Sequence, residues 1–201
     1  SSAASDVYKR QEDIASFARG FDRLLELKPH EIQFGILKRL RGTPIIRHTQ
    51  EYGLVFDPHP PYTILATDRI AFNEMQQLVR FARYWDLIAN SGRFAHTLPL
   101  ILREMPFANF MRLSNWLYAN TDATHRIALE RLAVLVRQWL VTEGMDEEAA
   151  AELLRSDYAG QANTKLKTQA ARKQAVTEEK KAAQQDALSS LTRRQARHMA
   201  S

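Results

Sequence analysis

The feature that most constrains the fold of this chain is a helical period that persists from Asp68 to Tyr158. Over these roughly ninety residues, apolar side chains recur every three or four positions, which gathers them on one face of a helix. Pro99 and Pro106 suit the first turns of two helices, because a proline lacks only an N–H that has no intrahelical partner there. Gly144 suits a helix end. The chain is therefore predicted to be mainly α, with a last helix over Asp146–Tyr158.

The first helix of this region is predicted to start after Asp68 and to end at Asn90-Ser91-Gly92, a cluster typical of a helix stop. Thr121 or Thr124 is predicted to cap a later helix, because a threonine hydroxyl accepts from a free backbone N–H. The predicted apolar stripe of the first helix consists of Phe72, Met75, Leu78, Val79, Ala82, Trp85 and Ala89. Three tryptophans, Trp85, Trp116 and Trp139, fall on apolar stripes, which favours core packing over a ligand platform.

The N-terminal part has a different pattern. Asp13–Leu27 is predicted as an amphipathic helix that ends at Lys28-Pro29, since proline removes a backbone donor. Glu31–Leu37 is short and apolar, which favours a buried strand. Brief strands are predicted at Leu54–Phe56 and Tyr62–Ala66, where they could pair with each other. A helix, a loop and a strand in this order form one αβ step of a barrel or layered sheet.

The positive charge of the chain belongs to its last forty or so residues. Residues 161–201 carry nine Lys or Arg against three Asp or Glu, whereas residues 12–160 carry a net charge of −2. No aromatic residue follows Gln161, so the tail lacks the stacking side chains that single-stranded nucleic acid needs. We expect a disordered segment or frayed helix rather than a nucleic-acid site. No apolar run is long enough for a membrane span.

The first residues, Ser1–Gln11, read SSAASDVYKRQ, and this string resembles one reading frame of a transposase adapter used in preparing DNA-sequencing libraries. The resemblance implies that the natural sequence begins at Glu12 and that the chain is part of a longer gene product. We expect Ser1–Gln11 to be disordered and dispensable.

Two stretches resemble a known family. Glu12–Ile45, which ends in LKRLRGTPI, is similar to the last helix, strand and turn of the radical S-adenosylmethionine (β/α) barrel. The segments GLVFDPHPPYTILAT, RFARYWDLIANSGRF and MPFANFMRLSNWLY resemble the uncharacterised C-terminal domain of a bacterial subgroup whose members carry a cobalamin-binding domain before the barrel. The fold expected from this resemblance is mainly α: a remnant αβ step of the barrel, short β segments and a helical C-terminal domain. The expected divisions are 1–11 (adapter), 12–48 (last αβ element), 49–160 (helical domain) and 161–201 (basic tail).

The resemblance implies a function for the parent protein rather than for this chain alone. The parent would be a cytoplasmic enzyme that cleaves S-adenosylmethionine at a 4Fe–4S cluster, with cobalamin as a further cofactor. The helical domain would cover the barrel mouth and shape the site of an unidentified substrate. The family's cluster is held by Cys-x3-Cys-x2-Cys, and this chain has no cysteine. By itself it should bind none of these cofactors and be inactive, its partner being the preceding part of the same protein.

The resemblance also implies which residues bind cofactor. The backbone after the last barrel strand meets the adenine of S-adenosylmethionine in this family, which implicates Leu37 and Lys38. Gln33 shares a strand face with Leu37 and is the better candidate for the barrel interior; the alternative is that it satisfies a buried backbone group. No catalytic residue and no metal ligand is predicted, since the six histidines never share a helix face at metal-binding spacing. Asp57-Pro58-His59 is interpreted as a polar turn.

Two other functions remain open. The chain could be a free-standing helical interaction domain with Glu12–Ile45 as its first layer, or an RNA-binding module that uses the basic tail. If the barrel interpretation holds, Glu31–Leu37 should lack its neighbouring strands, leaving Ile32, Phe34 and Ile36 with few partners. We then expect this strand to be unpaired or to pair with one of the two brief strands that follow it.

Overall fold

The computed structural model describes residues 2–6, 13–40 and 49–159 of the chain. Residues 1–157 form one unit, and only positions 158 and 159 of the second unit are described. The prediction of a mainly helical chain with few short strands is confirmed. The expectations for the basic tail, for the Gly42-Thr43-Pro44 turn and for residues 7–11 lie outside the described residues.

Helix α1 (Ile14–Glu26) forms where the sequence predicts it, because both of its ends are specified locally. Asp13 is the N-cap: the Ser16 N–H donates to its carboxylate at 2.7 Å, and the Asp13 N–H donates back to Ser16 Oγ at 2.9 Å. This reciprocal pair satisfies two of the backbone donors that a helix start leaves free. At the other end, Lys28 turns the chain with a φ of 49°, directly before Pro29.

Replacing Asp13 with Ala should remove a pH-dependent contribution to stability. The hydrogen bonds from Ser16 lower the pKa of the Asp13 carboxyl below its usual value. A depressed folded-state pKa stabilises the fold above the unfolded pKa, and this stabilisation is lost as the pH falls through the folded value. Urea unfolding from neutral pH down to about pH 3 should therefore show a flatter acid limb for Asp13→Ala. The exposed Glu104→Ala is the control; identical profiles for the two variants would contradict the prediction.

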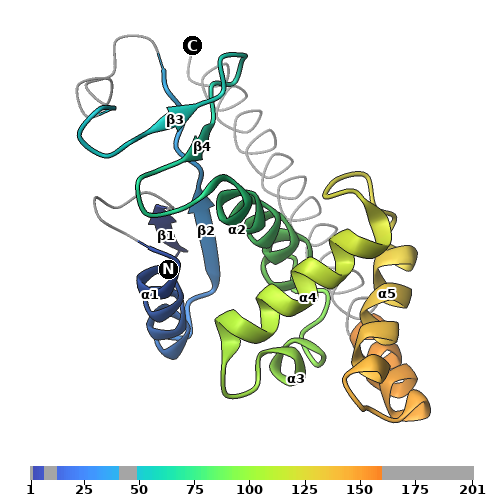
Figure 1. Cartoon of the computed structure of the whole chain (residues 1–201). Helices are drawn as coiled ribbons and strands as arrows, with labels where there is room; N and C mark the ends of the chain where they lie inside the picture. The colour runs from blue at the N-terminus through green and yellow to red at the C-terminus, as the bar shows by residue number, and fades with distance from the viewer. Residues whose placement is uncertain (1, 7–12, 41–48, 160–201) are drawn as a thin grey trace, which may run out of the picture. The chain divides into compact units, whose positions relative to one another are not determined.

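Strand β2 (Glu31–Gly35) pairs in parallel with β1 (Ser2–Asp6), with Ser2 opposite Glu31 and Asp6 opposite Gly35. The disorder expected for Ser1–Gln11 is therefore wrong where β1 is described, and β1 is a partner of β2 that was not expected; the expected pairing with Tyr62–Ala66 is present only at Leu37, just after β2. The reason is that strand pairing uses backbone groups, so Ser, Ala and Asp can occupy a free edge without an apolar side chain to bury. Strand, helix and parallel strand make a βαβ unit at this end (Figure 1).

The apolar side chains of β2 were expected from the sequence to have few packing partners. This expectation is wrong, because the apolar face of the strand is covered. Ile32 is 2% exposed, and the Phe34 ring lies 5.6 Å from that of Phe81. In Figure 1, β2 runs between α1 and α2 (Phe72–Trp85), so both helices supply aromatic rings to this face. The rings in mutual contact form what we call the aromatic cluster: Phe17, Phe21, Phe34, Phe81, Trp85, Phe107 and Phe110. The helix–strand step and the helical part therefore share one core.

A hairpin joins the C-terminal end of β2. Its strands are β3 (Val55–Phe56) and β4 (Ile64–Ala66), which pair antiparallel as predicted. The Ile64 N–H donates to the Leu37 carbonyl at 2.9 Å, and the Arg39 N–H donates to the Tyr62 carbonyl at 2.9 Å. These two bonds flank an antiparallel bridge between Lys38 and Thr63. The chain just after β2 is thereby held against the loop that connects β3 and β4.

The remaining helices follow the predicted order: η2 (Asp86–Asn90), a π-type turn that continues α2, then α3 (Leu98–Leu102), α4 (Pro106–Thr121), α5 (Leu129–Thr142) and a last helix over 147–159. The prolines open α3 and α4 as expected, and Gly144, with φ of 91°, follows α5. The predicted caps are wrong. Thr121 is the last residue of α4, where its hydroxyl donates to the Leu117 carbonyl, and α5 begins after Ala128 without a side-chain cap.

Two carboxylates hold helix starts that are distant in sequence. Asp22 of α1 accepts from the Phe107 N–H at the start of α4 at 2.9 Å. Asp157, 4% exposed, accepts from the N–H groups of His96 and Thr97 and from the Thr97 hydroxyl, at 2.7, 3.3 and 2.5 Å. A negative charge at a helix N-terminus is favoured by the free N–H groups there. The first and last helices of the unit are therefore tied to its middle.

Candidate functional site

The predicted cofactor-binding residues lie along β2 and its C-terminal extension. Gln33 is exposed, on the face opposite the buried Ile32, and its Nε2 donates to Glu31 Oε1 at 3.0 Å. Leu37 is half-buried against the core, and Lys38 is exposed beside the β3–β4 hairpin. The expected alternation of faces is present along β2. Gln33 is the middle residue of β2, whereas Lys38 lies beyond the C-terminal end of the strand.

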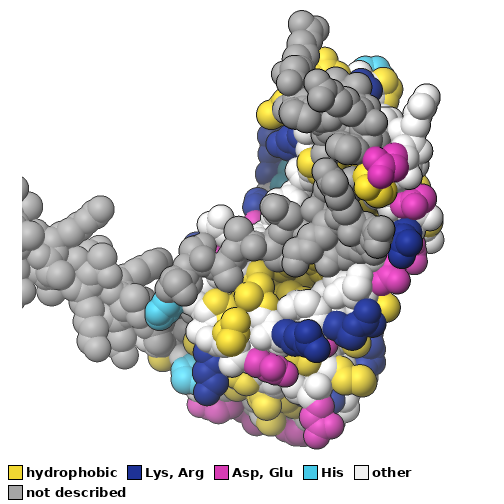
Figure 2. All heavy atoms as spheres, turned by 90° about the vertical axis from the view of Figure 1, so that its left-hand side faces the viewer, with side chains coloured by type: hydrophobic (Ala, Val, Ile, Leu, Met, Phe, Trp, Pro, Cys, Tyr) yellow, Lys and Arg dark blue, Asp and Glu magenta, His cyan; other side chains and the backbone are white. Residues whose placement is uncertain are grey.

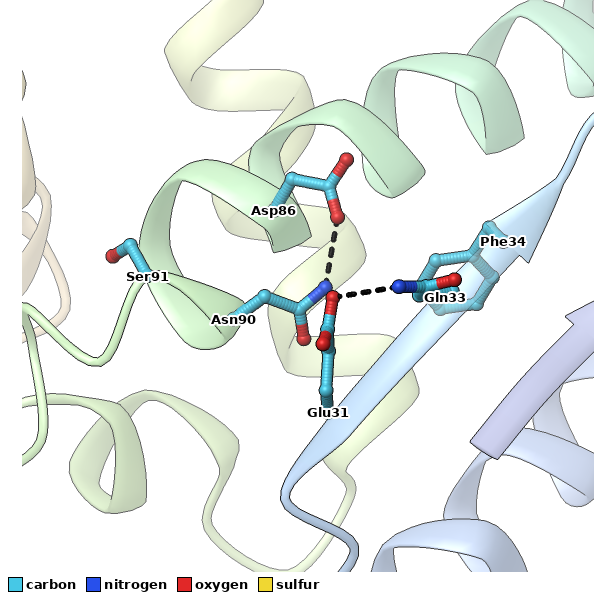
Figure 3. Close-up of a pocket in the computed structure, with 6 residues that line it drawn as sticks. All are labelled: Glu31, Gln33, Phe34, Asp86, Asn90 and Ser91. Atoms are coloured by element: carbon cyan, nitrogen blue, oxygen red, sulfur yellow. Dashed lines mark hydrogen bonds between the residues drawn. The ribbon is translucent and has the colours of Figure 1, made fainter. Parts of the chain in front are cut away.

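Gln33 lines a pocket of about 450 Å³ between β2 and η2. Figure 3 shows its walls: Glu31, Gln33 and Phe34 from the strand, and Asp86, Asn90 and Ser91 from the π-type turn and the residue after it. Leu37 and Lys38 are not among the lining residues. The volume is within the range of small-molecule sites. The structure thus brings one of the three predicted residues together with four polar side chains that were not predicted as site residues: Glu31, Asp86, Asn90 and Ser91.

Asn90 is the most constrained side chain in this pocket. Its Nδ2 donates to the Ile32 carbonyl and to Asp86 Oδ1, both at 2.8 Å. Its Oδ1 accepts from the Ile32 N–H at 3.2 Å and from Trp85 Nε1 at 3.1 Å. Both amide donors and both acceptor positions are therefore used. Exchanging oxygen and nitrogen would set the amide against two donors, so only this orientation fits.

The polar side chains of the pocket are hydrogen-bonded to one another. Glu31 and Asp86 are each held by an amide side chain, Gln33 and Asn90 respectively. Within residues 2–6, 13–40 and 49–159, no three His, Cys, Asp or Glu side chains are grouped so that they could hold a metal ion. The pocket runs along β2 from Glu31 to Phe34, and Leu37 and Lys38, which follow the C-terminal end of the strand, lie outside its lining.

Beyond the C-terminal end of β2, Lys38 and Arg39 lie against the segment that leads into β4. The Arg39 guanidinium lies 5.8 Å from the centre of the Phe56 ring. In the loop, the His59 N–H donates to Asp57 Oδ1 at 2.9 Å, and the His59 ring is 84% exposed. A side chain that accepts from the backbone two residues later makes an Asx turn. The Asp57-Pro58-His59 segment therefore has the geometry of the polar turn that we predicted.

On the lower part of the face seen in Figure 2, Lys and Arg side chains are interspersed with Asp and Glu. Across the described part of the chain, no helix combines the length and the apolar character required to cross a bilayer. Trp85 and Trp139 are buried and Trp116 packs against the core from its edge, as expected of structural aromatics.

The comparison with known families assigns the helical part. Residues 50–199 match a family described as "Protein of unknown function (DUF4080)". The match begins one residue after the predicted start of the helical domain at residue 49 and leaves α1 and β2 outside it. No curated protein matches the chain.

Proposed function

On the premise that this chain belongs to the DUF4080 family of proteins of unknown function, we propose that it is the C-terminal part of a radical S-adenosylmethionine enzyme with a cobalamin-binding domain. In this proposal, α1 and β2 are the last helix and strand of the catalytic barrel. The hairpin and helices after them cover one side of the barrel mouth and shape the substrate site. The resemblance of Glu12–Ile45 to the last barrel step is the basis for assigning these roles.

The observation that carries the proposal is the unequal burial of the two faces of β2. Ile32 and Phe34 pack under α1 and α2, while Gln33 and Gly35 on the other face are exposed. A strand of an α/β barrel has one face against the outer helices and one toward the interior. The exposed face of β2 has the character of an interior face whose opposite wall belongs to another part of the protein.

The parallel pairing of β2 supports the same assignment. A barrel strand accepts a parallel neighbour along its edge, and one edge of β2 does so with β1, although β1 lies within the adapter-like Ser1–Gln11 and is not itself the preceding barrel strand. Lys38 and Leu37 then belong to the C-terminal end of the strand, where barrel enzymes bind their substrates. One acceptor position of the Leu37 carbonyl is used by Ile64, so contact with an adenine would fall on the remaining backbone groups there.

The residues present do not fit an iron–sulfur cluster, because such clusters need cysteine thiolates and this chain has none. The cluster, and with it the cleavage of S-adenosylmethionine, would belong to the preceding part of the protein, as would cobalamin. We further propose a cytoplasmic location, which the absence of cysteine fits.

The test is to determine the DNA upstream of Glu12 and to express the complete reading frame. We expect it to encode Cys-x3-Cys-x2-Cys and its protein to acquire iron–sulfur absorption on anaerobic reconstitution, while this chain alone acquires none. In the complete protein, Gln33→Ala should lower the rate of S-adenosylmethionine cleavage about tenfold, the effect of roughly one hydrogen bond at a site. Gln138→Ala, on the exposed side of α5, is the matched control. An upstream frame without the motif, or a stoichiometric cluster on this chain, would overturn the proposal.

A free-standing helical interaction domain is the second candidate, and one observation favours it. The aromatic cluster joins α1 and β2 to α2 and α4 in a single core, so the unit can bury its apolar faces without another chain. The same upstream sequence decides between the two proposals. A stop codon shortly before Glu12, followed by a start codon between that stop codon and Glu12, would favour the free-standing domain.

A further inference from the structure

We propose that Asn90 closes one edge of β2 to strand pairing, so that any neighbouring strand joins β2 only along the edge where β1 lies. The inference concerns which surface of this sheet is open to a partner. It does not depend on the radical S-adenosylmethionine assignment, because it rests on the described hydrogen bonds alone.

The two edges of β2 can be told apart from Ile32. In an extended strand, the N–H and C=O of one residue point to the same edge, and those of the next residue point to the other. Both backbone groups of Ile32 bond the Asn90 side chain. The backbone groups of Glu31, Gln33 and Gly35 therefore point toward β1. Asn90 stands on the opposite edge.

The Asn90 amide takes the place that a peptide group of another strand would have. A neighbouring strand would offer Ile32 one C=O and one N–H, and the amide offers the same two groups at 3.2 and 2.8 Å. A side chain cannot continue a ladder, so pairing ends there. By alternation, the Phe34 backbone groups point to the same edge, into the pocket that Phe34 lines. With Ile32 bonded to Asn90, Phe34 is the position of β2 left on this edge, and a single position is too short for another strand to pair with.

The π-type turn explains how Asn90 reaches the strand. A π turn closes hydrogen bonds over five residues instead of four, and such turns are frequent at functional positions. The Trp85 indole N–H bonds Asn90 five positions later, while Asp86 accepts from the same amide. Trp85 and Asp86 thereby hold the Asn90 amide in the orientation in which it bonds Ile32. The sequence indicates only a helix stop at Asn90-Ser91-Gly92. A helix stop does not explain why the Asn90 side chain makes four hydrogen bonds.

The experiment compares the full chain with its Asn90→Ala, Asn90→Asp and Asn120→Ala variants. Asn120 is the control, an exposed asparagine whose Nδ2 also donates to a main-chain carbonyl, that of Trp116 at 2.8 Å. Two quantities are measured: amide hydrogen exchange of Ile32, and self-association by sedimentation velocity over a range of concentrations. We expect Asn90→Ala to raise Ile32 exchange about tenfold or more and to increase self-association, because Ile32 and Phe34 then offer two edge positions in register. Asn120→Ala should change neither.

Asn90→Asp keeps an acceptor for the Ile32 N–H but loses both donors, so its Ile32 exchange should lie between those of the native chain and Asn90→Ala. Should Asn90→Ala fail to fold, Asn90→Asp and the native chain decide the question. The proposal is overturned if Ile32 exchange is unaffected by loss of the amide. It is equally overturned if Ile32 exchanges fast while self-association stays at the native level, since the edge would then need no closure.

Discussion

Replacing Phe81 with Ala should lower the free energy of unfolding by about 3–5 kcal/mol, the usual effect of removing a large aromatic side chain from a core. Phe81 is fully buried, and its ring lies 5.1 to 5.6 Å from those of Phe21, Phe34, Phe107 and Phe110. These partners come from α1, β2 and α4. The loss should therefore appear in every element of the unit and not in α2 alone.

Phe72→Ala is the matched control for this prediction. Phe72 is the first residue of the same helix and is 56% exposed, so its removal should change stability by no more than about 0.5 kcal/mol. Urea unfolding followed by circular dichroism and by tryptophan fluorescence measures both variants. Coincident transitions for the two probes are expected if residues 12–48 and the helical part unfold together. Equal losses for the two phenylalanines would contradict the packing described above.

Replacing Asp157 with Ala should cost about 2–4 kcal/mol, because three donors lose a charged acceptor in a buried place. The Thr97 hydroxyl, on a residue with no exposed surface, would be left without this partner. Glu152→Ala is the control on the same helix: its carboxylate is 68% exposed and pairs with Arg155 at the surface, where an ion pair contributes little.

A double-mutant cycle tests the cause of the Asp157 effect. Thr97→Val and Asp157→Asn each weaken the contact between the hydroxyl and the carboxylate, so their combined loss should be smaller than the sum of the single losses. For each variant, thermal unfolding measures the stability of the unit, and limited proteolysis measures the rate of cleavage in the segment that follows Gly144. Strictly additive losses would show that Asp157 acts through something other than Thr97.

The sequence predicts the elements well where their ends are specified by neighbouring residues. Asp13 and Pro29 bound α1, and Pro106 opens α4, because caps and prolines act within a few positions. The predicted stripe of α2 was less accurate: it included Phe72, which is exposed, and missed Phe81, which is fully buried. A period of three or four residues defines a face only approximately, and which residues are buried depends on the helices packed against it.

The candidate site was less predictable because its residues meet through tertiary contacts. Asn90 and Ile32 are 58 positions apart, and nothing near either residue indicates the other. Gln33 was identifiable from strand alternation, which is a local property. The pairing of β2 with β1 was missed, since backbone pairing leaves no mark in the side chains of Ser2–Asp6.

The bond from the Phe107 N–H to Asp22 spans 85 positions, and this separation affects how the chain is made. Synthesis proceeds from the N-terminus, at roughly 5–20 residues per second. Phe17, Phe21 and Phe34 therefore leave the ribosome several seconds before Phe107 and Phe110, their partners in the aromatic cluster. During that interval the nascent chain exposes three phenylalanines with no α4 to cover them. Chaperone capture during translation should begin once α1 and β2 have emerged and end when α4 does.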